Sequence, residues 1–309
     1  MVSFSEFNFP SHDGKTVIRA VEWRPEGEIR AVVQIAHGVA EYIDRYGAFA
    51  NFLCEHGIAV IGNDHLGHGS SVAEGAARVW FSEQDGWQHV VDDMHSLRLE
   101  GGKRFPGVPY FLMGHSMGSF LARTYLIRYP GSVRGEILMG TGHQSGALVS
   151  AGRAVAKIEG KRVGWTGFSP LIESMAFGAY NKPFAPNRTT HDWLSVNEEN
   201  VDRYLADPLC GGKATVGLFH DMLGGIGFIR KPENVKKMDV RKPALFISGW
   251  QDPVGDMGKG VIAACNSFRN AGVTDLTLQL YPGMRHEILN ETGKEEVYDF
   301  IHQWLEKHI

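Results

Sequence analysis

The pentapeptide Gly114-His115-Ser116-Met117-Gly118 limits the fold of this chain more than any other segment. It follows the apolar run Tyr110-Phe111-Leu112-Met113 and precedes a helix-like segment at residues 119–129. A serine flanked by glycines between two such elements is typical of a sharp strand-to-helix turn that presents its hydroxyl at the edge of a sheet. The chain passes close to itself in such a turn, so the neighbouring side chains must be small. The pattern predicts an α/β protein with Ser116 as its nucleophile.

Strand and helix patterns alternate on both sides of this turn. Continuous apolar runs suit parallel strands that are covered on both faces, and their alternation with helices predicts βαβ units in a mostly parallel, doubly wound sheet. Two further strands at the start of the chain, joined by a tight turn at residues 12–15, should pair with each other. The expected strands are residues 4–9, 16–23, 31–36, 58–62, 108–113, 133–139, 244–248 and 276–281, and the expected helices are residues 42–55, 86–99, 119–129, 259–271 and 295–308.

The alternation stops after Gly140 and resumes near residue 239. We therefore expect a core domain of residues 1–140 and 239–309, with residues 141–238 forming a helical cap, or lid, inserted in the C-terminal half. The insert is rich in aromatic and apolar residues. Most of these should form the insert's own core, while a few line a pocket below it. The candidates for substrate contact are Trp165, Phe177 and Phe184.

A serine hydroxyl needs a general base, and that base needs a carboxylate to orient it. Asp252 and His286 follow the next two predicted strands after the insert, which gives the order serine, aspartate, histidine. We therefore predict Ser116, Asp252 and His286 as a catalytic triad. Asp256 is an alternative to Asp252, which is favoured because it follows the end of its strand directly.

The anionic intermediate of acyl transfer needs backbone N–H donors. One donor should be Met117, directly after the nucleophile. The other should come from the loop His37-Gly38-Val39-Ala40, which follows the predicted strand at residues 31–36. Because Gly38 allows this loop to turn inwards, Val39 is the natural second donor.

Charge and composition exclude several other functions. The formal net charge is −4 and the basic clusters are short, so nothing indicates a nucleic-acid partner. The segment Asn63–Ser71 is rich in His and Asp, but no other cluster completes a metal site with clear spacing. We expect no metal and no cofactor, and we interpret this segment as a polar loop that braces the rim of the site.

The three cysteines, Cys54, Cys210 and Cys265, are far apart in the sequence and suggest a reducing compartment. The N-terminus lacks a secretory signal pattern, and no apolar stretch reaches the ~18 residues that a membrane span needs. These features predict a cytoplasmic protein.

Several motifs together resemble the monoacylglycerol lipase and lysophospholipase branch of the α/β-hydrolase superfamily. The resemblance covers nearly the whole chain, and it implies the α/β-hydrolase fold, the triad and oxyanion donors named above, and a helical cap over an acyl pocket. Many relatives carry His where this chain has Tyr42. The matching segments are Gly114–Gly118, His37-Gly38 with Glu41 and Arg45-Tyr46, Asp64–Ser71, Asp207-Pro208-Leu209, Asp252-Pro253-Val254 and His286-Glu287.

The sequence therefore predicts a serine ester hydrolase that cleaves single-acyl lipid esters of the monoacylglycerol type. Lysophospholipase and short- or medium-chain carboxylesterase activities are the alternatives. A thioesterase, or a proline-type aminopeptidase that holds the substrate amine with an acidic residue of the cap, remains open. In a different class, the same fold could bind a small ligand without catalysis. The cap could also contact a membrane or micelle surface.

Overall fold

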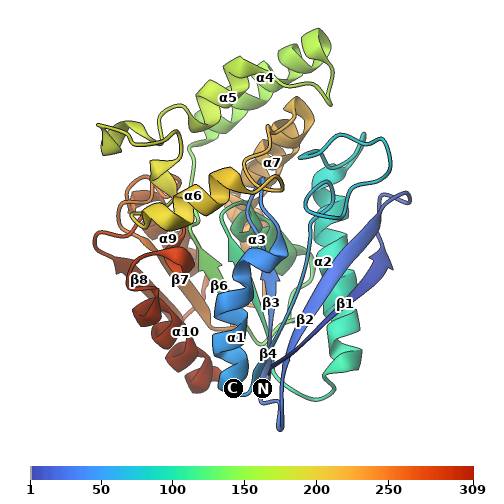
Figure 1. The fold of residues 1–309 in the computed structure, drawn as a ribbon, viewed down its shortest axis with the longest axis vertical. Coiled ribbons are helices and arrows are strands. Elements are labelled where there is room, and N and C mark those ends of the chain that lie inside the picture. The colour runs from blue at the N-terminus through green and yellow to red at the C-terminus, as the bar shows by residue number, and fades with distance from the viewer. Residues whose placement is uncertain (1) are drawn as a thin grey trace.

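A computed structural model of the protein describes residues 2–309, and its centre is a single eight-stranded sheet. The strand order across the sheet is β1-β2-β4-β3-β5-β6-β7-β8. Figure 1 shows the sheet with both chain termini near its lower edge. The strands are β1 (Val2–Pro10), β2 (Val17–Pro25), β3 (Ala31–Ala36), β4 (Ile58–Asn63), β5 (Tyr110–His115), β6 (Gly135–Met139), β7 (Ala244–Gly249) and β8 (Leu276–Tyr281).

The direction of the strands changes once across the sheet. β1 pairs antiparallel with β2, and β2 pairs antiparallel with β4, whereas every pair from β4 to β8 is parallel. Most of β1 is exposed, whereas β2 is largely buried and every residue of β3 to β7 is buried. All eight strands were predicted, and the mostly parallel α/β sheet is confirmed.

Helices cover both faces of the sheet, as expected for a doubly wound fold. On one face, α1 (Gly47–Glu55) and α10 (Lys294–His308) share an apolar core with residues of β3 to β7. On the other face lie α2 (Gly86–Arg104), α3 (Met117–Arg128) and α9 (Lys259–Ala271). The helix expected at residues 42–55 begins with a separate 3₁₀ turn, η1 (Ile43–Tyr46). Another 3₁₀ turn, η4 (Ile288–Asn290), follows β8.

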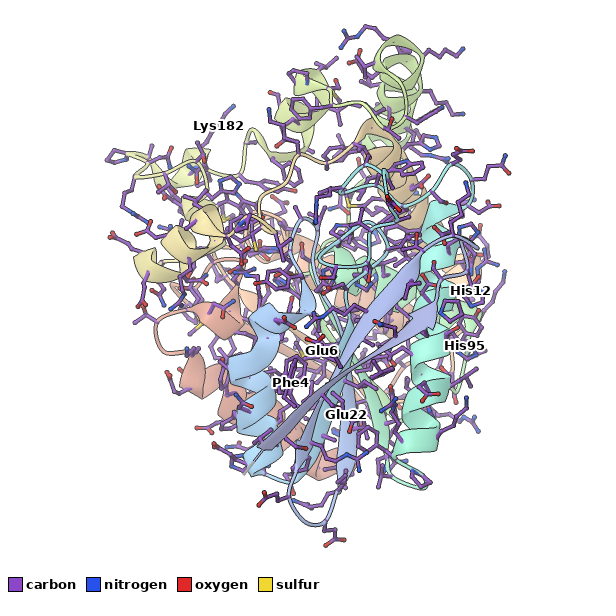
Figure 2. All side chains as sticks on the ribbon, turned by 45° about the vertical axis from the view of Figure 1, so that its right-hand side comes forward. Phe4, Glu6, His12, Glu22, His95 and Lys182 are labelled. Atoms are coloured by element: carbon purple, nitrogen blue, oxygen red, sulfur yellow. The ribbon has the colours of Figure 1, made fainter. Side chains whose placement is uncertain are left out.

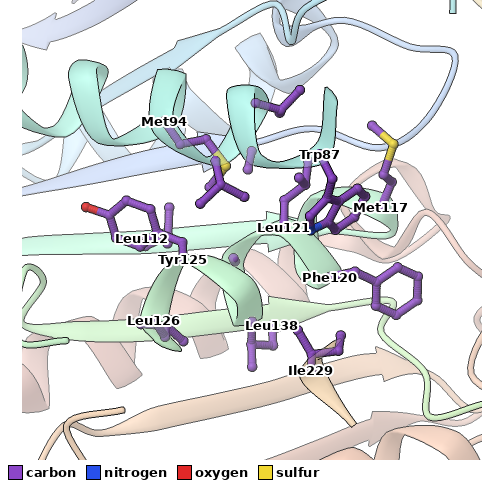
Figure 3. Close-up of a cluster of buried hydrophobic side chains, with 14 of the residues drawn as sticks. Trp87, Met94, Leu112, Met117, Phe120, Leu121, Tyr125, Leu126, Leu138 and Ile229 are labelled. Atoms are coloured by element: carbon purple, nitrogen blue, oxygen red, sulfur yellow. The ribbon is translucent and has the colours of Figure 1, made fainter. Parts of the chain in front are cut away.

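The helix α3 is buried along its length, which holds the preceding turn in place. Residues Met117 to Ile127 are all buried, so α3 has no solvent-facing stripe. Figure 3 shows its side chains between β5, β6 and the neighbouring helices. Trp87 of α2 packs here and donates a hydrogen bond of 3.0 Å from its Nε1 to Thr124 Oγ1. A close-packed setting of this kind restricts movement of the residues before α3.

Residues 141–238 contain helices and no strand. Most of this segment, called the insert below, lies above the carboxyl ends of the parallel strands (Figure 1). Lys182 of the insert is correspondingly far from the hairpin residues Glu6 and Glu22 in Figure 2. No helix within residues 2–309 has the length and apolar character needed to cross a membrane. The insert contains α4 (Gly146–Val163), α5 (Pro170–Phe177), η2 (Lys182–Phe184), η3 (Asp192–Leu194), α6 (Glu198–Ala206), α7 (Val216–Ile229) and α8 (Pro232–Val235).

Candidate active site

Ser116 occupies the turn between β5 and α3 in a strained backbone conformation, with φ 54° and ψ −122°. Non-glycine residues with positive φ are uncommon and often mark functional sites. The backbone passes so close to Gly114 and Gly118 that neither position has room for a side chain. A Cβ on Gly114 would collide with the carbonyl oxygen of Gly118, and one on Gly118 would collide with the carbonyl oxygen of Ala36. Glycine therefore allows the turn to form with Ser116 at its apex.

The structure places His286 and Asp252 in direct contact. His286 Nδ1 lies 2.9 Å from Asp252 Oδ2, and both side chains are buried. The carboxylate is fixed from two further directions, since Ser248 Oγ donates to Oδ2 at 3.1 Å and Val254 N–H donates to Oδ1 at 2.9 Å. This leaves Nε2 of the imidazole as the nitrogen available to Ser116, which borders the same hollow. The alternative carboxylate, Asp256, is exposed.

The two predicted backbone donors both lie close to Ser116. Met117 begins α3, so its N–H has no acceptor within the helix. Within residues 2–309, Val39 N–H donates to no protein acceptor, whereas Gly38 N–H is bound by Glu41 Oε1 at 2.6 Å. Both Val39 and Met117 border the same hollow as Ser116. The arrangement can supply two N–H groups to an oxygen that carries developing charge.

A buried ionic network supports the loops that carry Val39 and His286. Arg45 Nη1 donates to Glu41 Oε2 at 2.6 Å and to Glu287 Oε1 at 2.7 Å, and Arg45 Nη2 donates to Glu287 Oε2 at 2.8 Å. His115 Nδ1 lies 3.3 Å from Glu41 Oε1, and its Nε2 lies 3.2 Å from the backbone carbonyl oxygen of His286. The network therefore contacts both the loop at residues 37–40, called the oxyanion loop after its predicted role, and the loop at residues 282–287, called the histidine loop.

Burial and charge act against each other in this network. Burial alone would raise the pKa of Glu41, but the hydrogen bond with His115 and the charge of Arg45 hold that pKa well below its usual value. Burial would also raise the pKa of Glu287, but the charge and hydrogen bonds of Arg45 outweigh this effect and lower that pKa. Burial would lower the pKa of His115, but its contacts with Glu41 raise it above 6.5. Both carboxylates are thus held in their charged form.

The network also joins the insert to the core. Asn200 of α6 donates from Nδ2 to Glu287 Oε2 at 2.7 Å. The Tyr204 ring lies 4.9 Å from the Arg45 guanidinium carbon, a cation–π contact. The Tyr42 hydroxyl donates to Asp207 Oδ2 of the insert at 2.8 Å. These contacts join α6 and the adjoining Asp207 to the core.

Two hollows meet at Ser116. One is mainly apolar, and its lining comes from the insert, from α3 and from Val39; its residues include Phe120, Leu148, Val155, Ile172, Met175, Phe219, Met222, Leu223 and Ile226. The other is more polar and is lined by His286, the oxyanion loop and the insert; its residues include Glu41, Glu173, Ser174, Thr190, His191, Tyr204 and Glu287. Val39, Phe177 and Trp193 border both hollows.

The three aromatic candidates from the insert occupy different places. Phe177 borders both hollows at Ser116. Trp165 is exposed and lines a separate hollow between the insert and α2. Phe184 lies beneath the Arg285 guanidinium, 4.0 Å from its carbon, and borders neither hollow at Ser116. Trp193 was not among the predicted substrate contacts. Its ring centroid lies 5.2 Å from that of His286.

The loop at residues 63–71 packs against the base of the site. The Asp64 carboxylate accepts hydrogen bonds from the backbone N–H groups of Ile43 and Ser70, and it forms an ion pair with Arg19. The rings of His65 and His37 pack with centroids 4.2 Å apart, and His37 Nε2 accepts the backbone N–H of His65. Since His37 begins the oxyanion loop, residues 63–71 support that loop from below.

The sequence predicted no role for Glu41, Arg45 or Glu287, although all three belong to segments that carried the family resemblance. Glu41 and Arg45 are spaced four apart, which is suited to an ion pair on one turn. Glu287 directly follows His286, but nothing in the sequence indicates that it meets Arg45 across 242 positions. Such a long-range contact becomes visible only in the folded chain.

Comparisons with known proteins show which family the chain belongs to. A family model described as "Serine aminopeptidase, S33" matches residues 27–293. The chain is 28% identical to a monoacylglycerol lipase of Mycolicibacterium smegmatis, over 99% of this chain and 98% of that protein. It is also 28% identical to the monoglyceride lipase of Homo sapiens, over 92% and 84% of the two chains.

A solved structure of a thermostable carboxyl esterase from Bacillus coagulans, in complex with glycerol, superimposes with a TM-score of 0.90. The two chains are 28% identical, and the match covers 99% of each. The sheet, the strained serine turn and these similarities agree: the chain belongs to the α/β-hydrolase family described as serine aminopeptidase, S33, and monoacylglycerol lipases and esterases are among its relatives.

Proposed function

We propose that this protein hydrolyses carboxylic esters of single acyl chains, of the monoacylglycerol type, through an acyl-enzyme on Ser116. The observation that carries the proposal is the position of Ser116 between a mainly apolar hollow and a more polar one. An ester with an apolar acyl chain and a polar alcohol fits this division, with the scissile bond at the serine. The names of the relatives, monoacylglycerol lipase and carboxyl esterase, support the same class.

The chemistry follows from the residues at the junction. Ser116 Oγ attacks the ester carbonyl carbon while His286 Nε2 takes the hydroxyl proton, and Asp252 stabilises the imidazolium through Nδ1. The carbonyl oxygen becomes negatively charged and accepts the N–H groups of Val39 and Met117. His286 then protonates the alcohol oxygen as the C–O bond breaks. Water, deprotonated by His286, attacks the acyl-enzyme and releases the fatty acid and Ser116.

The apolar hollow is suited to the acyl chain. Its volume is about 170 Å³, more than the ~150 Å³ of an engineered cavity that binds benzene. Leu148, Met175, Met222 and Leu223 provide flexible apolar walls, which can adapt to chains of different length. Most of this lining comes from the insert, so in this proposal residues 141–238 act as a cap over a core of residues 1–140 and 239–309.

The outer face of the insert supports contact with a lipid surface. Exposed apolar side chains lie on α4 and α5, and Lys157 and Lys161 lie on the same α4. Apolar side chains beside basic ones favour anionic lipid surfaces. Co-sedimentation with anionic vesicles, lost in Ile158→Glu, would test this contact. The exposed apolar residues of these two helices that border neither hollow at Ser116 are Ile158 and Leu171.

A matched substrate panel tests the proposed function. It contains p-nitrophenyl esters from acetyl to palmitoyl, 1-monoacylglycerols and lysophosphatidylcholine. We expect turnover of monoacylglycerol with a medium or long chain, and a loss of at least ~10³-fold in kcat for Ser116→Ala. A short-chain optimum without lipid turnover would instead favour a general carboxylesterase. No turnover, and no labelling of Ser116 by a fluorophosphonate, would contradict the proposal and favour a non-catalytic binder.

A further inference from the structure

Arg123 of α3 is a charged side chain enclosed in the core. It is 1% exposed, and its helix packs in the apolar core that Figure 3 shows. Its Nη1 donates to the backbone carbonyl oxygen of Gly142 at 2.8 Å and lies 3.5 Å from Thr141 Oγ1. Within residues 2–309, its Nε and Nη2 are buried and meet no acceptor. These two nitrogens carry three of the five N–H groups of a guanidinium, so most of its donor capacity is unused.

No carboxylate in the described part of the chain balances this charge. Burial lowers the pKa of Arg123 to about 10, and no acidic neighbour opposes the shift. The guanidinium therefore stays charged at neutral pH. Because buried charges in proteins are normally paired and hydrogen-bonded, a counter-charge must come from outside the chain.

Two further basic side chains lie at the same place, along the linker of residues 140–145 that joins β6 to α4. His143 belongs to this linker, and its Nδ1 is buried without a partner. Arg230 lies against Gly146, where a Cβ would stand 2.6 Å from its Nη1, and its Nε is also buried without a partner. Burial and then the charges of Arg123 and Arg230 lower the pKa of His143, and no acid opposes them. Two guanidinium groups and an imidazole therefore gather here without a carboxylate.

The chemistry of this cluster suits a small monovalent anion. One fully buried guanidinium lacks one negative charge, and N–H donors on separate side chains suit a spherical acceptor better than a planar one. The first turn of α4, which begins beside Arg230, adds free backbone N–H groups and the positive end of a helix dipole. The enclosure of Arg123 favours an ion of halide size over a phosphate, which would have to lose a larger hydration shell.

We propose that a halide-sized monovalent anion, such as chloride, binds between Arg123, His143 and Arg230 and fixes the linker by which the insert is attached to the core. Arg230 caps the end of α7, so the anion connects α3, the linker and α7. Gln144 of the same linker lines the apolar hollow at Ser116, so the anion also supports one wall of that hollow. This inference is independent of the proposed ester hydrolysis.

Thermal unfolding in two sodium salts tests the site. Chloride and the much larger gluconate are compared at the same ionic strength, about 0.1 M, so that general screening is equal. We expect the Tm of the wild-type protein to be about 3–5 °C higher in chloride. In Arg123→Met the two salts should give the same Tm, and the Tm in gluconate should be no lower than that of the wild-type protein, because the unbalanced buried charge is gone. The matched control is Arg241→Met, an exposed arginine paired with Asp239, which should keep the full chloride effect.

Two partly exposed residues give a second route if Arg123→Met does not fold. His143→Gln and Arg230→Gln should each lose part of the chloride effect on Tm. An unchanged chloride effect in both variants would overturn the proposal, as would equal Tm values of the wild-type protein in the two salts.

Bromide locates the anion directly. Crystals grown in sodium bromide should show an anomalous difference peak in contact with Nε or Nη2 of Arg123. Water in place of bromide at Arg123 would overturn the proposal. A bromide peak without a chloride-dependent Tm would show an adventitious ion only and would overturn it as well.

Discussion

The guanidinium of Arg45 and the carboxylate of Glu287 form a bidentate pair, with N–O distances of 2.7 and 2.8 Å, directly beside His286. Planar pairs of this kind fix geometry as well as charge. Because Arg45 also binds Glu41, whose Oε1 accepts the Gly38 N–H, one buried cation connects the histidine loop with the oxyanion loop. In the proposed mechanism, the preorganisation of the site therefore depends on residues outside the predicted triad.

Removal of Arg45 should destabilise the protein and impair catalysis together. Arg45→Met leaves two buried carboxylates without their cation, which should lower the free energy of unfolding by about 3–5 kcal/mol. Urea unfolding and kcat measure the two effects. In the double variant Arg45→Met/Glu287→Gln, part of the stability should return because one of the unpaired charges is gone. Strictly additive losses in the double variant would show that the two residues are not coupled.

Asp252→Asn should preserve the fold and disable the base. The amide can occupy the same space, but it no longer favours the His286 tautomer with a proton on Nδ1, so kcat should fall about 10³–10⁴-fold. Asp256→Asn provides the matched control, since Asp256 is exposed and follows the same strand. Comparable activity of the two variants in ester hydrolysis would argue against Asp252 as the orienting carboxylate.

The glycines of the serine turn should tolerate no side chain. In Gly118→Ala the new Cβ would collide with the backbone of Ala36, so we expect a loss of about 3 kcal/mol in the free energy of unfolding. Gly102→Ala in α2 is the control: its Cβ meets only the flexible end of Arg98, and alanine favours the helix by about 0.5–1 kcal/mol. Denaturant unfolding of both variants distinguishes steric conflict from a general intolerance to alanine.

Stability should decline in mild acid because of the histidines beneath the oxyanion loop. Burial lowers the pKa of His37 to about 4 and that of His68 to about 3, from 6.5. The unfolded chain therefore binds more protons below pH 6.5, and stability is complete above that pH and falls as the pH drops towards 4. Each histidine contributes about 1.4 kcal/mol per pH unit to this slope.

His68→Gln isolates one of these contributions. The variant should show a shallower fall in unfolding free energy between pH 6.5 and 4 than the parent protein, whatever its stability at neutral pH. Urea unfolding at a series of pH values gives both slopes. Parallel pH profiles for the two proteins would contradict a neutral, buried His68 in the folded state.

The sequence predicted the sheet well because its strands are short, continuous apolar runs separated by strong turn signals. Predicted and observed strand positions differ by a few residues at most; β5, for example, continues to His115, so Ser116 follows it directly. The start of α1 was less predictable, because the 3₁₀ turn at residues 43–46 has the same apolar spacing as a helix. Local sequence patterns were therefore enough to predict most strands and helices around the central sheet.

The walls of the site were less predictable. Trp165 and Phe184 are as aromatic as Phe177, yet only Phe177 borders the hollows at Ser116. Their positions depend on how the helices of the insert pack against the core, which the sequence pattern does not determine. The partners of Glu287 could not be predicted either, because Arg45 and Asn200 are distant from it in the sequence.

The most direct test of the central claim is the intact mass of the protein after reaction with a fluorophosphonate, followed by peptide mapping. We predict a single adduct on Ser116, its absence in Ser116→Ala, and much slower labelling in His286→Ala. Ester hydrolysis by an unlabelled protein, or an adduct on a residue other than Ser116, would contradict the assignment of Ser116 as the nucleophile.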